Sequence, residues 1–216
     1  VGSEMCKETE LLQRHDELAA RGEEKQLTLR AGELLQTYPH IEQNLQAIRE
    51  KFAFTGKQFQ IQVPDKLEDI FMDSRKLCHC IANSDVYWER MERRESYLLF
   101  LRKTAEPDTP YYTVEAEPGG TVRQVRTQYN RQNDDIGEVR AFLKIWQKQL
   151  AKRLTQKDKQ LAADSHELRI KELVQLRNDQ VTIHTGDLAG RLLVDVLTED
   201  LMEAHNKNGV GAQQRF

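Results

Sequence analysis

A pair of glycines between two strand-like segments is the feature that most limits how this chain can fold. The turn sequence Pro118-Gly119-Gly120-Thr121 is preceded by residues 111–117 and followed by residues 122–128. Both flanking segments contain β-branched residues and mix apolar with polar side chains, which is typical of strands. The pattern predicts an antiparallel hairpin with the double glycine at its tip. An isolated hairpin is only marginally stable in water, so one of its faces must pack against other elements.

A two-residue loop at Gly119-Gly120 would fix how the two strands pair. Counting outward from this loop places Glu115 opposite Gln124. The same count places Thr113 opposite Arg126. Because side chains alternate along a strand, these four polar residues project from one face of the hairpin. A loop of three residues would shift the pairing and break this arrangement. The opposite, mostly apolar face carries Tyr112, Val114, Val125 and also Arg123.

Helical periodicity dominates the sequence on both sides of the hairpin. Gly22 is suited to end the first helical segment, and the apolar stripe of residues 135–154 indicates packing rather than a cofactor site. Helices are expected at residues 4–21, 27–38, 41–52, 135–154 and 165–181, with another that begins at Asp65 and a last one opened by residues 185–187.

Two more segments are expected to be strands. Residues 59–63 alternate apolar and polar side chains, whereas residues 96–102 form a short, continuously apolar and aromatic run. The sequence therefore predicts an α+β fold with a small antiparallel sheet of about four strands. Amphipathic helices would surround this sheet, with the long helices on its C-terminal side. We divide the chain into an N-terminal helical segment at residues 1–56, an α+β core domain at 57–154, and a C-terminal helical extension with a loose tail at 155–216.

Composition limits which compartments and binding partners are expected for the protein. The formal net charge is -3, so nucleic-acid binding would need a local basic patch rather than a global field. Three cysteines do not make a disulfide framework, which favours a reduced, cytoplasmic setting. No apolar run reaches the roughly 18 residues that a membrane span requires. We therefore expect a cytoplasmic protein that does not enter a membrane.

The run Cys78-His79-Cys80 is the densest group of reactive side chains, and a helical stretch over residues 77–81 is expected to carry it. His79 titrates near neutral pH and can act as a general acid or base. Cys80 is a candidate nucleophile if a base or a helix terminus lowers its pKa. Both cysteines also fit as small core residues, and His79 as a hydrogen-bonded, partly buried histidine. The three side chains are too close together to supply three tetrahedral ligands, so no metal site is expected.

The polar strand face offers a candidate site near His79. His79 would transfer a proton, Glu115 would act as orienter or base, and Arg126 would stabilise a phosphate. The simpler alternative is that Glu115 and Arg126 form a diagonal surface ion pair. Residues expected to bind the substrate are Arg102, Tyr111, Thr113, Gln124 and Asn130.

Aromatic and basic residues near the end of the hairpin suggest contact with a nucleic acid. Such residues can hold a backbone, stack a base and hydrogen-bond its edge. The alternative for Tyr129 is an ordinary amphipathic surface aromatic. The residues are Tyr111, Arg126, Tyr129, Asn130 and Arg131.

In these same residues the chain resembles the PcfJ-like family, which is encoded by conjugative plasmids, integrative elements and phages. The resemblance covers roughly residues 60–150. Cys78 stands where the family usually has a second histidine, Asn83 lies where a glycine often follows, and Thr127 replaces a glycine after Arg126. The shared segments are Leu77-Cys78-His79-Cys80-Ile81, Leu98-Leu99-Phe100-Leu101-Arg102, Pro110-Tyr111-Tyr112-Thr113-Val114-Glu115, Gln124-Val125-Arg126, Asn130 and Trp146. The resemblance implies a mobile-element setting and no particular reaction.

Three functions fit these observations. The first is a protein that binds or acts on nucleic acid, either a nuclease or a relative without catalysis. The second is a non-catalytic module whose helices dock proteins of a plasmid transfer or phage replication system. The third is group transfer from a nucleotide such as NAD, for which the sequence identifies no pocket and no cofactor.

Overall fold

The computed structural model describes residues 21–79, 81, 84–184 and 187–204, in two compact units that divide at His40 and Ile41. In the first unit, residues 21–37 form one helix. Gly22 lies inside this helix, so the prediction that it ends a helix is wrong. A Cβ at Gly22 would meet no atom within 4 Å, and an exposed glycine can be helical at a cost of about 1 kcal/mol relative to alanine. The helix predicted before it lies outside the described residues.

The second unit is an α+β fold, as predicted, built on one antiparallel sheet with the strand order β1-β2-β3-β4-β5. The sheet has five strands, because the two-residue β1 pairs with β2 and adds to the four expected from the sequence. The strands are β1 (Phe54–Thr55), β2 (Phe59–Gln62), β3 (Tyr97–Lys103), β4 (Tyr112–Ala116) and β5 (Val122–Arg126).

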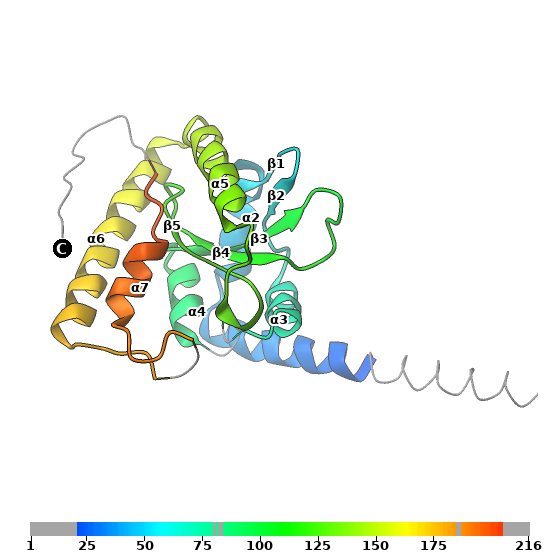
Figure 1. Cartoon of the computed structure of the whole chain (residues 1–216). Coiled ribbons are helices and arrows are strands. Elements are labelled where there is room, and N and C mark those ends of the chain that lie inside the picture. Colours follow the sequence, from blue (N-terminus) through cyan, green and yellow to red (C-terminus); the bar gives the residue numbers. More distant parts are fainter. Residues whose placement is uncertain (1–20, 80, 82–83, 185–186, 205–216) are drawn as a thin grey trace, which may run out of the picture. The chain divides into compact units, whose positions relative to one another are not determined.

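Helices pack against both faces of this sheet (Figure 1). They are α2 (Ile41–Phe52), α3 (Leu67–Lys76), α4 (Asp85–Glu92), the 3-10 turn η2 (Gln128–Asn130), α5 (Ile136–Ala151), α6 (Gln156–Asn178) and α7 (Leu193–Asp200). The long α6 begins before the predicted start at Ser165, because Thr155 caps it. The Thr155 side chain accepts from the Asp158 backbone N–H, and the Asp158 carboxylate accepts from the Thr155 backbone N–H in return. The polar first turns of α6 carry no apolar period that would have revealed them.

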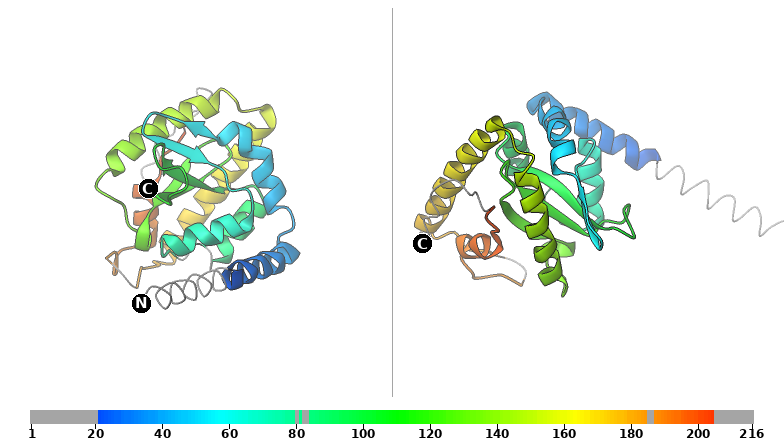
Figure 2. Two further views of the ribbon diagram at one scale, coloured as in Figure 1. Left: turned by 90° about the vertical axis from the view of Figure 1, so that its right-hand side faces the viewer. Right: turned by 90° about the horizontal axis from the view of Figure 1, so that it is seen from above.

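α5 covers the apolar face of the sheet, and its buried stripe confirms the packing role predicted for residues 135–154. Trp146 of α5 donates a hydrogen bond from its indole to the Phe52 carbonyl at 2.7 Å. The Phe52 ring in turn meets Tyr97 of β3 edge-on, with centroids 5.6 Å apart. This layer holds α2, α5 and the sheet in one core, which can be followed in the two turned views of Figure 2.

The β4–β5 hairpin has the predicted register but not the predicted loop. Thr113 pairs with Arg126 and Glu115 pairs with Gln124, which confirms both expected pairings. The Glu117 N–H donates to the Thr121 carbonyl, so the loop contains three residues, 118–120. Ala116 pairs with Val122, which leaves Arg123 as an extra residue in a β-bulge. The bulge offsets the longer loop and restores the pairing.

Gly120 is needed at the tip of this hairpin. Its φ of 87° lies in the left-handed region that favours glycine. A Cβ at this position would also lie 2.9 Å from Leu150 Cδ2 of α5, so a larger residue would disturb both the turn and its packing.

The bulge also decides where Arg123 points. The sequence placed Arg123 on the apolar face, and this prediction is wrong because Arg123 lies among the carboxylates of the polar face. Its Nε lies 2.9 Å from Glu117 Oε1, and its Nη1 lies 3.0 Å from Glu95 Oε1. Arg169 of α6 donates to the same Glu117 oxygen at 2.8 Å. Buried ion pairs thus join the hairpin to α6.

We expect Arg123→Met to destabilise the fold by about 3–5 kcal/mol, because it leaves Glu95 and Glu117 buried with fewer counter-charges. Urea unfolding of the purified protein measures this. Arg93→Met is the matched control: Arg93 also faces Glu95 but its side chain is 61% exposed, so its loss should cost less than about 1 kcal/mol. Equal unfolding midpoints for the two variants would contradict a structural role of the buried Arg123 pairs.

Candidate functional site

A continuous chain of buried polar side chains crosses the space between α3 and the sheet. Asp73 of α3 forms an ion pair with Arg102 of β3 and accepts a hydrogen bond from Thr113 Oγ1 of β4 at 2.8 Å. His79 Nε2 lies 2.8 Å from the same Thr113 oxygen. All four side chains are buried. We call Asp73, His79, Arg102 and Thr113 the proton network.

His79 reaches this network because α3 ends earlier than the sequence suggested. The helix stops at Lys76 with Leu77 as its C-cap, so the prediction that Leu77, Cys78 and His79 are helical is wrong. Cys78 is exposed and adopts a left-handed conformation with φ 49°, and the His79 N–H donates back to the Ser74 carbonyl at 3.1 Å. This tight turn directs the imidazole towards β4 instead of along the helix.

The hydrogen-bond partners of His79 show how a proton could move. The Ser74 hydroxyl donates to the His79 carbonyl at 2.8 Å, so its oxygen can accept a hydrogen bond from the Nδ1–H of His79, 3.1 Å away. The Thr113 hydroxyl can donate only one hydrogen bond. It donates to Asp73 when His79 Nε2 carries a proton, and it donates to Nε2 when Nε2 carries none. The protonation state of His79 therefore sets the direction of the Thr113 hydroxyl, and with it the number of donors on Asp73.

Burial moves the pKa values of the two titrating groups towards each other. Burial lowers the pKa of His79, and the nearby Asp73 charge opposes this only in part. Burial raises the pKa of Asp73, against the opposing effects of Arg102 and Thr113. Both groups also lie within hydrogen-bond distance of the same Thr113 hydroxyl, which connects the two residues.

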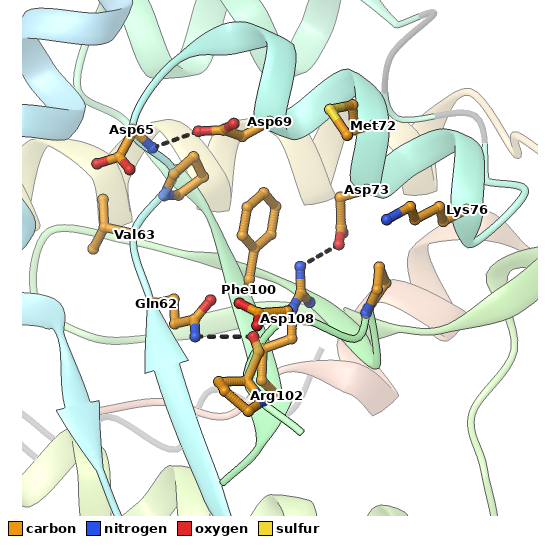
Figure 3. A pocket seen from close by; sticks show the side chains of 13 residues that line it. Gln62, Val63, Asp65, Asp69, Met72, Asp73, Lys76, Phe100, Arg102 and Asp108 are labelled. Atoms are coloured by element: carbon orange, nitrogen blue, oxygen red, sulfur yellow. Dashed lines mark hydrogen bonds and ion pairs between the residues drawn. The ribbon is translucent and has the colours of Figure 1, made fainter. Parts of the chain in front are cut away.

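A pocket of about 300 Å³ opens beside the network, and Asp73 and Arg102 belong to both (Figure 3). α3 supplies one side of the pocket, and β2, β3 and the β3–β4 loop supply the others. Asp73 is paired with Arg102, and Asp65 with Arg49. Lys76 and Asp108 also line the pocket, are exposed, and make no hydrogen bond or ion pair with another described residue.

Glu115 lies on the same sheet face but in a second network. Its carboxylate accepts hydrogen bonds from Arg90 of α4 at 2.9 Å, from Ser96 at 2.6 Å and from Gln124 at 2.8 Å. Burial raises the pKa of Glu115, but Arg90 and Arg123 lower it more, so the net pKa lies below the ordinary value. This fully satisfied carboxylate is suited to anchoring α4 on the sheet rather than to accepting a proton from a substrate.

Arg126, the third predicted catalytic residue, belongs to a third network. It forms an ion pair with Asp200 of α7, which also accepts from Gln132 at 3.2 Å. Arg126 lies directly opposite Thr113 in the sheet, so the three predicted catalytic residues share a face. They do not share partners, and the described pocket is not lined by any of them.

The remaining predicted residues lie around these networks. Tyr111 donates a hydrogen bond to Asp135 ahead of α5, and Gln124 also donates to the Tyr87 hydroxyl at 2.7 Å. Asn130 adopts a left-handed conformation with φ 60° in η2. The predicted nucleophile Cys80 lies outside the described residues. Among the described residues, no group of three or more histidine, cysteine, aspartate or glutamate side chains is arranged to hold a metal ion.

Sequence reasoning missed Asp73 and Ser74, although a signal for them exists. Both fall three and four residues after Ile70, on the side of α3 that also buries Leu67 and Phe71. Polar side chains at core positions of an amphipathic helix need buried partners, and the following histidine and the arginine of β3 provide them. Arg90, in contrast, lies in a charged run that resembles an ordinary solvated helix face.

The fold and site together define an α+β protein with a buried network of hydrogen-bonded and ion-paired side chains beside a polar pocket. The PcfJ-like family model matches residues 4–140, and the chain belongs to this family. The whole proton network lies within the matched residues, whereas α6 and α7 follow them. Family membership associates the protein with mobile genetic elements. Comparison with curated proteins and with solved structures found no match.

No helix in the described part of the chain combines the length and apolar composition needed to cross a bilayer.

We expect His79 to make folding stability depend on pH. Because its folded-state pKa lies below the ordinary value of 6.5, the unfolded state binds the proton more tightly. Stability should therefore fall as the pH decreases from 6.5 towards the folded-state pKa. Thermal unfolding between pH 7.5 and 5.5 should show this loss in the natural sequence and a smaller loss in His79→Gln.

His166→Gln serves as the control, since His166 is exposed on α6 and lies outside the network. Asp73 contributes with the opposite sign, because its raised pKa makes stability decrease as the pH rises through its titration. The relevant quantity is therefore the difference between the variants at each pH. Parallel pH profiles for His79→Gln and the natural sequence would rule out this role for His79.

Proposed function

We propose that this protein binds single-stranded nucleic acid as part of the transfer or replication of a mobile element. The observation that carries the proposal is a backbone hydrogen bond from Tyr129 N–H to the Leu77 carbonyl at 3.0 Å. It brings η2 next to the C-terminal end of α3, although the two segments are far apart in the sequence. The resulting strand-binding surface consists of Arg75, Lys76, Tyr129, Asn130 and Arg131.

The side chains of this surface have the chemistry that single strands require. Tyr129 is 64% exposed, which is unusual for a tyrosine and leaves its ring free to stack on a base. Arg131 pairs with Asp187 at 3.0 Å, but both side chains are more than 60% exposed, so a phosphate could replace the carboxylate at little cost. The surface provides the local basic patch that a chain of net charge -3 needs for such binding.

The backbone of η2 supports a preformed surface. Tyr129 and Asn130 both adopt left-handed conformations, with φ values of 56° and 60°. Non-glycine residues pay about 1–2 kcal/mol for this conformation, so the surrounding contacts must hold it in place. A backbone that already holds Tyr129 at the surface loses little conformational entropy when a base stacks on the ring.

The proton network is the candidate catalytic centre of this binding protein. His79 is buried, and it follows by two residues the Leu77 carbonyl that accepts from the Tyr129 N–H of the strand-binding surface. Thr113 connects it to Asp73 and hence to the pocket. A phosphate or hydroxyl entering there would meet Arg102 as a charge stabiliser and Asp73 as a proton acceptor. The networks of Glu115 and Arg126 would maintain the sheet face around it.

A docking module for transfer proteins is the competing function, and the exposed Leu168 and Val174 on α6 favour it. The two functions use different parts of the molecule, so variants can separate them. Leu168→Ser should leave nucleic-acid binding unchanged if our proposal holds, and Tyr129→Ala should leave the docking of a protein partner on α6 unchanged.

Fluorescence anisotropy with labelled single- and double-stranded DNA and RNA tests the proposal. We expect tighter binding of single strands, and a loss of about 1–3 kcal/mol of binding free energy in Tyr129→Ala, because one base stack is removed. Tyr129→Phe keeps an aromatic face and should bind nearly as well as the natural sequence. If Tyr129→Ala binds as tightly as Tyr129→Phe, the stacking role is excluded.

Charge is tested by the salt dependence of the same binding. Lys76→Gln should lower the slope of log affinity against log salt by about 0.7, the value for one single-strand phosphate contact. Lys157→Gln removes an equal charge from the exposed surface of α6 and should leave the slope unchanged. Absence of binding at low salt would defeat the proposal as a whole.

A further inference from the structure

The pocket beside α3 and the strand-binding surface share one residue, because Lys76 lines the pocket and also belongs to that surface. Figure 3 shows Lys76 and Asp73 from α3 on one side of the pocket, with Asp108 across from the helix. A strand held at Lys76 by a phosphate therefore has a cavity next to the attached nucleotide. A base-binding role for this cavity would add base selectivity to the proposed single-strand binding, and it rests on that proposed function.

The pocket has an exposed apolar side chain, Met72, against which a flat ring can pack. Phe100 projects into the middle of the lining in Figure 3, below Met72 of α3. Phe100 is buried, and the Arg102 guanidinium covers one face of its ring at 4.4 Å from the centroid, so the exposed apolar surface of the pocket belongs to Met72. Met72 is 45% exposed, and a thioether packs well against an aromatic ring. The volume of about 300 Å³ is at the lower end for small-molecule pockets, which suits one nucleoside rather than a larger ligand.

Most of the carboxylates around the pocket are already engaged. Asp73 is paired with Arg102, and Asp65 with Arg49. Asp69 accepts backbone N–H bonds from residues 65 and 66 at the start of α3. Only Asp108 remains among the carboxylates of the lining without a partner in the described part of the chain. Because the other carboxylates are paired or hydrogen-bonded, Asp108 remains as the unpaired negative group of the described lining, and it lies across the pocket from the positive group of Lys76.

A carboxylate with two available oxygens selects among the bases. Guanine presents two adjacent N–H donors on its Watson–Crick edge, which can form two parallel hydrogen bonds to one carboxylate. Thymine presents one N–H between two carbonyl oxygens, which a carboxylate would repel. Cytosine and adenine each offer an amino group beside a ring nitrogen that only accepts. Lys76 at the pocket entrance can hold the phosphate of the same nucleotide.

We infer that this pocket takes one unpaired guanine of the bound strand, with its ring against Met72, its Watson–Crick edge on Asp108 and its phosphate at Lys76. The site makes the protein selective for guanine at one position of an otherwise sequence-independent contact. Reading an unstacked base on its Watson–Crick edge is how proteins commonly distinguish bases in single strands. The buried proton network then lies against the nucleotide in the pocket, through Asp73 and Arg102.

The test compares labelled oligothymidine with the same oligomer carrying one central guanine, using the full chain. We expect the guanine oligomer to bind roughly tenfold more tightly, as for one good bidentate base contact. Asp108→Asn should remove this preference while leaving the affinity for oligothymidine unchanged or higher. Glu106→Gln is the matched control: it neutralises an exposed carboxylate in the same loop, outside the pocket lining, and should keep the preference.

The outcomes separate the two proposals. Binding of both oligomers with equal affinity would overturn the guanine pocket and leave the strand-binding surface standing. A guanine preference that survives in Asp108→Asn would also overturn it, because the selectivity would then arise elsewhere. If neither oligomer binds at low salt while circular dichroism shows a folded protein, the proposed function itself fails.

Discussion

Burying a charged sheet face requires that each charge find a partner, and this requirement organises the protein. The face of β3, β4 and β5 opposite α5 carries Arg102, Glu115 and Arg126. Each is matched by a residue from a different helix: Asp73 of α3, Arg90 of α4 and Asp200 of α7. Hydrophobic packing on the other face could hold helices in many rotations. The ion pairs fix one arrangement, because a helix that slipped would leave a charge buried without compensation.

The hairpin shows how far sequence patterns reach. Alternation and the double glycine correctly predicted the pairing of Thr113 with Arg126 and of Glu115 with Gln124. The two-residue loop assumed for this pairing is wrong, because a three-residue loop and a bulge at Arg123 cancel each other's shift. Local propensity carries no information about a bulge. The carboxylates around Arg123 come from three segments, and only tertiary contact selects the bulged form.

The same limit applies to the candidate site. Residue type and spacing identify His79, Thr113 and Arg102, and the structure joins them. Asp73, which connects them, is hard to recognise in the sequence because its partners lie far along the chain. Glu115 and Arg126 were expected to surround a phosphate with His79 or, alternatively, to form a diagonal ion pair with each other, whereas each forms an ion pair with a helix. Sequence shows which side chains share a strand face, whereas long-range packing decides which ones can still reach a ligand.

The segment after α7 has a consequence for the boundary of the fold. β5 is the outermost strand, and Met202 forms a two-way backbone bridge with Val122 that covers part of its open edge. The matched family region ends at residue 140, before this segment. A fragment cut there would expose an unprotected strand edge, and such edges recruit further strands and promote self-association. In this protein the C-terminal residues therefore cover part of a strand edge that could otherwise pair with another chain, and they also supply counter-charges.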